Sequence, residues 1–229
     1  MRVERIGSAT LYHGDCTQVL AEADVLITDP PFGITDAEWD RVVPAEAWMT
    51  AKGAVCFAAE PYASELIRTA PLPFKYDLVW AKNCPTNTLN CDIRPSRAHE
   101  RILVFGGPSY TPQRVKRTDE EMKRLNAEQR AYMQWKAPES VLYFDAINNR
   151  SSERTEHSAQ KPVDLMEYLV LTYSRPAEVV GDWFMGSGTT GVACMKAGRM
   201  FVGIEKDEGF FELACERIRN AQRQERLFA

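Results

Sequence analysis

The sequence predicts an α/β fold, in which a mixed, mostly parallel sheet carries helices on both faces. Short apolar runs alternate with helical patterns along most of the chain. One apolar run ends at an Asp-Pro-Pro-Phe quartet, and another leads into a glycine-rich turn that opens a helix. Strands that alternate with helices are typical of open α/β sheets, which bind ligands beyond the carboxyl ends of their strands.

Each expected element follows from the spacing of apolar residues between glycines and prolines. The expected strands are residues 9–13, 23–28, 53–58, 76–80, 101–105, 178–184 and 201–205. The expected helices are residues 62–69, 119–135 and 163–173, a helix after the glycine turn, and a final helix to about residue 223. Pro162 stands where a proline of the first helical turn belongs.

The alternation is interrupted over residues 108–154, which we expect to form an inserted segment of a single domain, residues 1–229. Residues 94–154 hold 12 Lys and Arg against 8 Asp and Glu, a charge of +4. The other residues hold 16 against 24, which gives −8 and the total of −4. A basic segment on an acidic body can bind a polyanion, although a chance cluster of loop charges would look similar.

Composition excludes several classes of protein. With 45% hydrophobic and 26% charged residues, the chain is neither disordered nor fibrous. No apolar run approaches about 20 residues, and the first residues lack the apolar run of a secretory signal. We therefore expect a cytoplasmic protein without a membrane span. The six cysteines include no CxxC pair, so we expect reduced thiols and no metal site.

The glycine-rich turn DWFMGSGTTG, residues 182–191, predicts a nucleoside site. Glycines permit a tight turn and let a ligand approach the backbone, and the helix that follows offers free N–H groups. Glu205 ends the next expected strand, 21 residues after Phe184. An acid at that place typically accepts hydrogen bonds from ribose hydroxyls.

The same turn satisfies the GxGxxG pattern of nicotinamide-dependent oxidoreductases, which stay a remote alternative. Only 38 residues follow Gly191, too few to complete such a sheet, so the other strands must come from the N-terminal part. The motif order is therefore permuted. A third reading is a nucleotide-binding module without catalysis. A Walker-type phosphate loop is excluded, because no Gly-Lys-Ser/Thr follows.

The quartet Asp29-Pro30-Pro31-Phe32 follows the apolar strand that ends at Thr28. A proline holds the residue before it in an extended conformation and has no N–H of its own. The turn therefore presents a carboxylate and carbonyl acceptors without a competing backbone donor. Such acceptors beside an aromatic face suit a flat ring that carries an exocyclic amino group, so we predict that this turn binds such a ring.

Together these motifs resemble the S-adenosylmethionine-dependent amino DNA methyltransferases, in the permuted (beta) group where the catalytic motif precedes the cofactor motif. The quartet Asp29-Pro30-Pro31-Phe32 resembles the catalytic motif of this family, which implies that these four residues are catalytic. The resemblance covers most of the chain and implies a Rossmann-like methyltransferase sheet. It implies S-adenosylmethionine as cofactor, double-stranded DNA as partner, and direct in-line methyl transfer to a flipped-out base, with no metal. Residues 108–154 fall where this family has a target-recognition segment.

The resemblance also assigns residues. Residues 12–16 resemble the strand end that contacts the cofactor's adenine, and residues 157–162, HSAQKP, resemble the motif that holds its methionine part. The expected cofactor-binding residues are Asp15, Cys16, Asp29, Gln160, Lys161, Pro162, Asp182, Phe184, Gly186, Ser187, Gly188, Thr189, Thr190 and Glu205. The expected DNA contacts are Lys82, Arg114, Lys116 and Arg117. The last three are expected from their basic charge alone, and solvated loop charges are the alternative.

The target base follows from the resemblance as well. Asp at position 29, where a related group has Ser, favours adenine N6 over cytosine N4, and amino methylation of RNA is a further alternative. Phe32 stands where Tyr is commoner and keeps the stacking face. The recognition sequence, any partner restriction enzyme and the bacterial or phage host stay open, and a homodimer is expected by analogy alone. Whether residues 119–135 dock on DNA, a second subunit or their own domain is also open.

Overall fold

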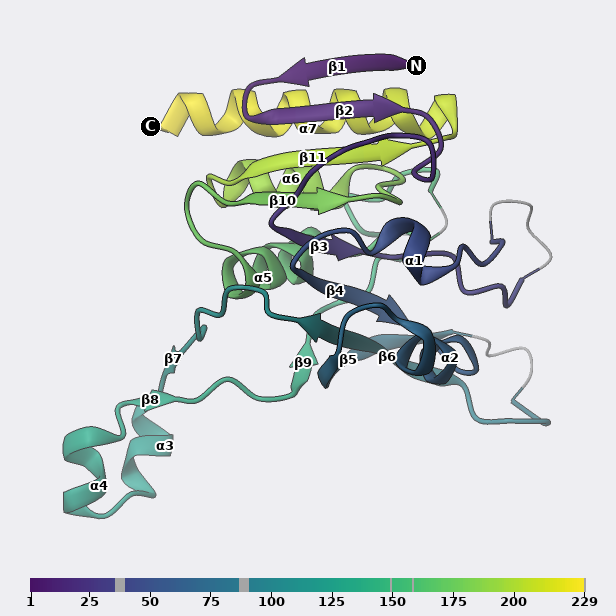
Figure 1. Ribbon diagram of the computed structural model, residues 1–229. Helices are drawn as coiled ribbons and strands as arrows, with labels where there is room; N and C mark the ends of the chain where they lie inside the picture. The colour runs from purple at the N-terminus through teal and green to yellow at the C-terminus, as the bar shows by residue number, and fades with distance from the viewer. Residues whose placement is uncertain (36–39, 87–90, 149, 158, 229) are drawn as a thin grey trace.

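The computed structural model describes residues 1–35, 40–86, 91–148, 150–157 and 159–228. Over these residues the main sheet has nine strands in the order β1-β2-β11-β10-β3-β4-β6-β5-β9 (Figure 1). The strands are Arg2–Ile6 (β1), Ala9–His13 (β2), Val25–Thr28 (β3), Gly53–Ala58 (β4), Phe74–Thr86 (β5), Arg97–Gly106 (β6), Val141–Tyr143 (β9), Val179–Asp182 (β10) and Met200–Glu205 (β11). A second, two-stranded sheet pairs Val115–Lys116 (β7) with Trp135–Lys136 (β8).

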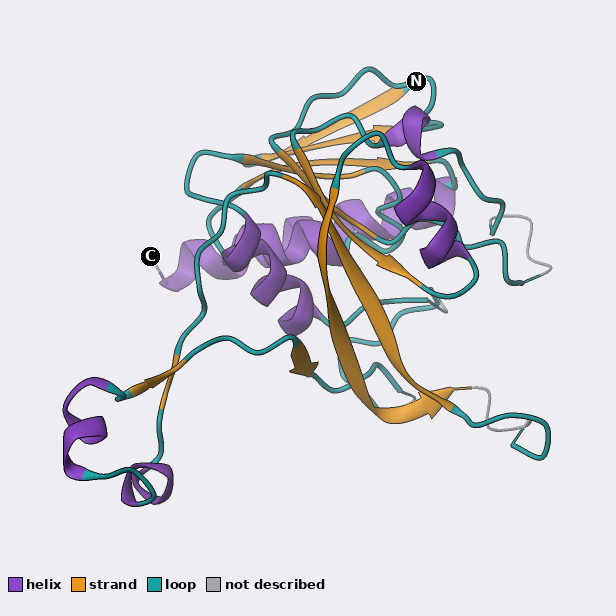
Figure 2. Cartoon of the chain, turned by 60° about the horizontal axis from the view of Figure 1, so that its bottom comes forward, coloured by secondary structure: helices purple, strands orange, loops and turns teal. Residues whose placement is uncertain are grey.

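Helices cover both faces of the main sheet (Figures 1 and 2). The helices are Ala45–Trp48 (α1), Tyr62–Thr69 (α2), Asp119–Lys123 (α3), Ala127–Tyr132 (α4), Val163–Tyr173 (α5), Thr189–Lys196 (α6) and Glu208–Phe228 (α7). Helices α5, α6 and α7 lie on one face, and α1 and α2 lie on the other.

The side chains of β3 show how the sheet is buried from both sides. Val25 and Ile27 belong to the apolar cluster that includes α5, α6 and α7, whereas Leu26 belongs to the cluster of α1 and α2. Successive side chains of a strand point to opposite faces, so a strand covered on both faces reads as a continuous apolar run. This burial explains why the short run before Asp29 was recognisable in the sequence.

Five neighbouring strands, β2, β11, β10, β3 and β4, are parallel, so their carboxyl ends meet at one edge of the sheet. We call this the carboxyl edge and the opposite one the amino edge. Strand β6 runs antiparallel to β4, which places the start of β6 at the carboxyl edge. Strand β5 then runs in the direction of β4 and ends at that edge as well.

The structure confirms most expected elements and the α/β class. Strands β2 and β4 and helices α2 and α5 have the expected bounds. Strands β5 and β6 are longer than expected, because their hairpin continues beyond the strands next to it (Figure 2). The edge strand β1 was not expected, because its sequence RVERI is largely charged and exposed. The short elements α1, β7, β8 and β9 have too few residues for a periodic pattern.

The single helix expected over residues 119–135 is wrong. The chain forms α3 and α4 instead, and Trp135 lies in a strand. Each helix begins with its own capping box, Thr118 with Glu121 and Asn126 with Gln129. The second box offers the backbone a new helix start, which ends the first helix before it.

The inserted segment has two structural parts. Residues 115–136, which we call the arm, extend from the amino edge away from the sheet (Figures 1 and 2). Helices α3 and α4 of the arm contain no buried residue. The rest of the insertion returns to the body, where β9 pairs with β5 as the last strand of the main sheet. The insertion is therefore partly integrated into the sheet that it interrupts in sequence.

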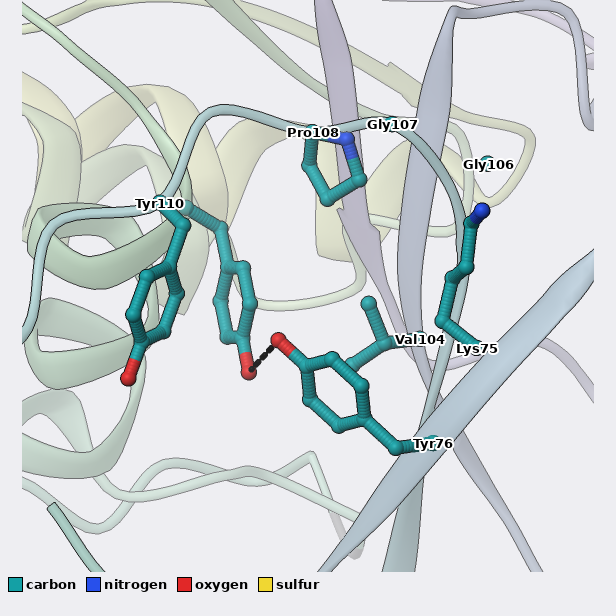
Figure 3. A pocket seen from close by; sticks show the side chains of 8 residues that line it. Lys75, Tyr76, Val104, Gly106, Gly107, Pro108 and Tyr110 are labelled. Atoms are coloured by element: carbon teal, nitrogen blue, oxygen red, sulfur yellow. Dashed lines mark hydrogen bonds between the residues drawn. The ribbon is translucent and has the colours of Figure 1, made fainter.

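A cavity of about 530 Å³ lies at the amino edge, beside the base of the arm. Its lining includes Tyr76 and Tyr173, whose hydroxyls are 3.5 Å apart, and Tyr110 (Figure 3). In the part of the chain that the structure describes, no helix is long and apolar enough to cross a membrane, and no cluster of three metal-binding side chains occurs.

Candidate functional site

The carboxyl edge gathers the ends of three neighbouring strands. Asp29 follows β3, Asp182 is the last residue of β10, and Glu205 is the last residue of β11. Because β10 lies between β3 and β11, the quartet Asp29–Phe32 and the glycine turn are adjacent in space, although about 150 residues separate them in sequence. The two strongest sequence motifs therefore share one site.

Asp29 belongs to a cluster of four charged side chains that come from four elements. Lys161, just before α5, donates a hydrogen bond to Oδ2 of Asp29. The Lys161 ammonium also lies 3.6 Å from Oε2 of Glu100 on β6, and Lys82 on β5 donates to Oε1 of the same carboxylate. These side chains are between 6% and 23% exposed, so the four charges balance one another away from bulk water.

The electrostatics of this cluster keep its charges in place. Burial raises the pKa of Asp29, and Lys161 opposes the shift. For Glu100, burial acts in the same direction, but Lys161 and Lys82 outweigh it and lower its pKa. Burial would lower the pKa of Lys161, yet Asp29 and Glu100 raise it. Lys161 is therefore a cation at neutral pH and stabilises the ionised form of Asp29.

The glycine turn depends on glycine at two positions. Gly186 and Gly188 have φ angles of +50° and +77°, in the left-handed region. A Cβ atom on Gly188 would lie 2.8 Å from Cβ of Ala214 on α7. The turn can therefore bring the chain close to α7 only with glycine, and it directs the first amides of α6 toward the carboxyl edge.

Two acids fix this turn from within. Asp182 accepts hydrogen bonds from the hydroxyls of Thr28 and Thr190, at 2.6 and 2.5 Å, and from the amide of Phe184. Burial raises its pKa to about 6. Glu205 accepts from the amide of Gly186 at 2.8 Å and from the amide of Asp207 at 2.8 Å. Burial raises the pKa of Glu205 as well.

Arg217 and His157 support the same turn from other elements. Arg217, on α7, donates to the carbonyl and hydroxyl of Ser187 and to the hydroxyl of Thr189. His157 packs edge-on against Phe210, and a Cβ atom on Gly186 would lie 2.8 Å from its Nε2. Burial, with Lys161 and Arg217, lowers the pKa of His157 to about 4, so its ring is neutral at pH 7.

The sequence profile of a DNA methylase family matches residues 68–216, which is about two thirds of the chain. The chain belongs to the N6/N4 DNA methylase family. The match includes the glycine turn, Glu100 and Lys161, whereas Asp29 lies before it.

Two curated proteins with similar sequences are type II methyltransferases. The chain is 29% identical to the type II methyltransferase M.HinfI of Haemophilus influenzae, over 62% of this chain and 38% of the relative. It is 24% identical to the type II methyltransferase M.BglII of Bacillus subtilis, over 90% of this chain and 68% of the relative. The chain thus spans well under half of the first relative's length.

Solved structures share the fold of this DNA methylase. The complex of M1.HpyAVI with S-adenosylmethionine has a TM-score of 0.60 at 24% identity, covering 91% of this chain and 99% of that chain. The PvuII cytosine-N4-specific DNA methyltransferase has a TM-score of 0.64 at 15% identity, covering 96% and 93%. The expected Rossmann-like methyltransferase sheet is thereby confirmed.

Several expected cofactor-binding residues of the methylase have partners within the chain. The side-chain amide of Gln160 accepts from Thr155 and donates to the carbonyl of Glu153, so it fixes the loop before α5. Asp15 accepts from the amide and hydroxyl of Thr17. Burial raises the pKa of Cys16 to about 11, which leaves its thiol protonated. Pro162 is the residue that precedes the first turn of α5.

The expected DNA contacts fall into two places. Lys82 has a side chain only 6% exposed and is paired with Glu100, so it lies inside the Asp29 cluster and not on an open basic surface. Arg114 and Lys116 are exposed, but they lie at the base of the arm, at the amino edge. Arg117 donates to the carbonyl of Met133 within the arm. The geometry thus separates these three residues from Asp29.

Three further residues that shape the site were not recognised in the sequence as such. Arg217 is one of many charged residues of a long helix, and Asp40 and Tyr62 belong to no motif. Tyr62 stacks on Phe32, with ring centroids 5.6 Å apart and planes at 28°. The role of each depends on contacts between distant elements, and no local pattern of residues carries that information.

Proposed function

We propose that this protein methylates the exocyclic N6 amino group of adenine in double-stranded DNA, with S-adenosylmethionine as the methyl donor. Family membership supports DNA methylation. The preference for adenine rests on Asp at position 29 and on the resemblance to the permuted amino methyltransferases. The observation that carries the proposal is the state of the Asp29 carboxylate.

One oxygen of Asp29 is held by the chain and the other is left for a ligand. Lys161 occupies Oδ2, whereas the buried Oδ1 has no hydrogen-bond partner among the described residues. Buried carboxylate oxygens normally have partners, so Oδ1 is open to a hydrogen-bond donor on a bound ligand. The two prolines after Asp29 have no N–H and cannot supply one. An amino group can donate one hydrogen to Oδ1 and the other to the carbonyl of Pro30.

The residues of the glycine turn fit the proposed cofactor. Gly186 and Gly188 leave the backbone open where a side chain would stand, and α6 directs its free amides to the same edge. Each carboxylate oxygen of Glu205 accepts one hydrogen bond within the chain and retains a further lone pair for a ribose hydroxyl. S-adenosylmethionine supplies an activated methyl group when it is bound there.

The chain's own residues then have distinct tasks. Asp29 and the Pro30 carbonyl hold the amino nitrogen and draw its lone pair out of conjugation with the ring. Asp29 also stabilises positive charge that develops on this nitrogen, in a site with little water. Phe32 stacks on the flipped-out base and returns about 1–3 kcal/mol, comparable with the few kcal/mol that flipping costs. Holding the amino nitrogen in line with the methyl group reduces the entropic cost of bringing the two reactants together.

Nucleoside mass spectrometry tests the proposal. Unmethylated DNA of diverse sequence is incubated with the purified protein and S-adenosylmethionine, then digested to nucleosides. We expect N6-methyladenine. N4-methylcytosine would keep the fold and cofactor but overturn the choice of base. The absence of any methylated base, with methylation of RNA in a parallel reaction, would overturn DNA as the substrate.

The variants Asp29→Ala and Asp29→Asn test the role of the carboxylate. Both are expected to abolish methyl transfer, because neither presents an anion to the amino group. Calorimetric titration with S-adenosylmethionine is expected to show binding in both, since the glycine turn and Glu205 are unchanged. Turnover by Asp29→Ala at the wild-type rate would contradict the assignment.

A further inference from the structure

One carboxylate binds the backbone of residues 32–35, which begins at the last residue of the catalytic quartet. Asp40 Oδ1 accepts hydrogen bonds from the amides of Phe32 and Gly33, at 2.8 and 2.9 Å. Its Oδ2 accepts from the amides of Ile34 and Thr35, at 3.0 and 2.8 Å, and from the hydroxyl of Thr35 at 2.7 Å. Four consecutive backbone donors thus converge on a single side chain.

The environment of Asp40 favours this arrangement. The residue is 5% exposed, and a buried ionised carboxylate is stable only when hydrogen bonds replace its water. Burial acts to raise its pKa, but the hydrogen bonds from Thr35, Gly33 and Ile34 outweigh burial and lower the pKa. Asp40 is therefore an anion that holds four dipoles, and each of these bonds is of the strong, charge-assisted kind.

The position of these donors matters because of what precedes them. Pro30 and Pro31 have fixed φ angles and no N–H groups. Phe32 is the first residue after Asp29 that has a backbone donor, and this donor goes to Asp40. The backbone from Asp29 to Thr35 is thus held by two prolines and then by one carboxylate. As a result, the position of Phe32 relative to Asp29 is fixed by the backbone.

The ring of Phe32 is also oriented from the other side. It stacks on Tyr62 of α2, and it is only partly buried, so one part of it stays accessible. Gly33 next to it has a φ angle of +67°, and a Cβ atom there would lie 2.7 Å from Cγ2 of Val42. The loop therefore turns sharply after Phe32 and is closed by Asp40.

We propose that Asp40 is a positioning residue for the target base: its carboxylate fixes residues 32–35 so that Phe32 stacks on the flipped-out ring while Asp29 binds the amino group. The inference rests on the proposed function, because Asp40 supports Phe32, the residue that stacks on the base in that reaction. Asp40 itself touches neither the base nor the methyl donor.

The variant Asp40→Asn tests this role. An amide of the same shape has one acceptor oxygen and an NH2 group that faces two backbone donors, so two of the four amides lose their partner. We expect kcat to fall by about 100-fold, as for a misplaced reacting group, with the Kd for S-adenosylmethionine unchanged. With 2-aminopurine in place of the target adenine, the rise in fluorescence on DNA binding should be smaller than in the wild type.

A matched control is Asp24→Asn. Asp24 also accepts a hydrogen bond from a backbone amide, that of Val179 at 2.9 Å, but it lies before the other end of β3. The same chemical change there should leave kcat and the fluorescence signal as in the wild type. Equal losses in both variants would show a general effect on folding and would overturn the inference.

Two further measurements separate positioning from stability. In a double-mutant cycle with Phe32→Leu, Asp40→Asn should add little to the loss of kcat, since both act on the same ring. If the loss of kcat in the double variant equals the product of the losses in the two single variants, the inference is overturned. Hydrogen exchange of the amides of residues 32–35, without DNA, should accelerate in Asp40→Asn. This readout is independent of methylation: if the wild type methylates nothing, the proposed function fails, whereas unchanged exchange refutes the role of Asp40.

Discussion

Lys161 donates a hydrogen bond to Asp29 across 132 residues of sequence and forms the electrostatic centre of the site. The sequence resemblance placed Lys161 among residues for the methionine part of the cofactor, whereas its ammonium lies between Asp29 and Glu100. Its ammonium nitrogen also lies over the ring of Phe57, 4.8 Å from the ring centroid. The lysine thus offsets the cost of burying the Asp29 carboxylate.

The variant Lys161→Met should move the acid limb of the pH–rate profile to higher pH. In the proposed mechanism Asp29 acts as an anion. Its pKa is already raised by burial, and removal of the nearby cation raises it further. On the acid limb the rate falls about tenfold per pH unit, so the variant should lose most activity at the low end of the pH range and recover part of it as the pH rises. Rates measured over the pH range with saturating substrates test this, and a limb at the wild-type position would disprove the electrostatic role.

The variant Glu100→Gln should shift the same limb in the opposite direction. Glu100 raises the pKa of Asp29 by charge repulsion and competes with it for Lys161. Without that charge, Lys161 and Lys82 act on Asp29 alone and lower its pKa. Thermal unfolding of both variants serves as the control for folding. Shifts in the same direction would mean that the four charges do not act as one cluster.

The variant Gly188→Ala should lose affinity for S-adenosylmethionine. Residue 188 has a left-handed backbone conformation, which alanine adopts only with strain. The added methyl group would also lie 2.8 Å from Cβ of Ala214, so the turn must move. Gly198→Ala is the matched control, because its φ angle is +63° but nothing lies within 4 Å of the added atom. Backbone strain alone destabilises that variant by about 1–2 kcal/mol. Calorimetric titration should show weakened binding in Gly188→Ala only.

The sequence predicted those parts of the site that have a local signature. Asp29 and the glycine turn each join a buried strand to a turn of unusual composition, and both lie where the sheet order brings them together. The helix Val163–Tyr173 was predicted with its bounds, because its apolar residues repeat with helical spacing and Pro162 marks its start.

The contacts that hold the site could not be predicted in this way. The partnership of Glu100 with Lys161 depends on the antiparallel register of β6 against β4. The four bonds of Asp40 close a loop whose residues 36–39 lie outside the described part of the chain. Arg217 reaches the glycine turn because α6 packs on α7. Such contacts arise from tertiary packing, which overrides local propensity.

Asp182 should make stability fall as pH rises from about 4 to 6. Its pKa is raised from 3.8 to about 6 in the folded protein, so the folded state binds the proton more tightly than the unfolded state. This stabilisation is present below pH 3.8 and is lost through pH 6, with a size on the order of 3 kcal/mol. Asp182→Asn should flatten this part of the Tm profile, since Thr28 and Thr190 can reorient their hydroxyls. An unchanged slope in that variant would assign the effect to another group.

The surface that meets DNA should be the carboxyl edge. Arg97 is the first residue of β6, opposite Thr86 of β5, and Arg94 precedes it by three residues, so both belong to the end of this hairpin at the carboxyl edge. In a complex of one protein with one duplex, the variant Arg94→Ala/Arg97→Ala should weaken binding. It should also reduce the slope of log affinity against log salt concentration by about one for each arginine removed. The variant Arg114→Ala/Lys116→Ala, at the base of the arm, should have a smaller effect on both quantities.

Fluorescence anisotropy at several salt concentrations measures both DNA-binding variants against the wild type. If the arm variant loses as much affinity and salt dependence as the hairpin variant, the duplex contacts both edges of the sheet. A target-recognition role for residues 108–154 is then favoured. If only the hairpin variant is affected, Arg114 and Lys116 at the base of the arm make no phosphate contacts with this duplex. In either case the salt slope distinguishes phosphate contacts from indirect effects, because only lost contacts release fewer counterions.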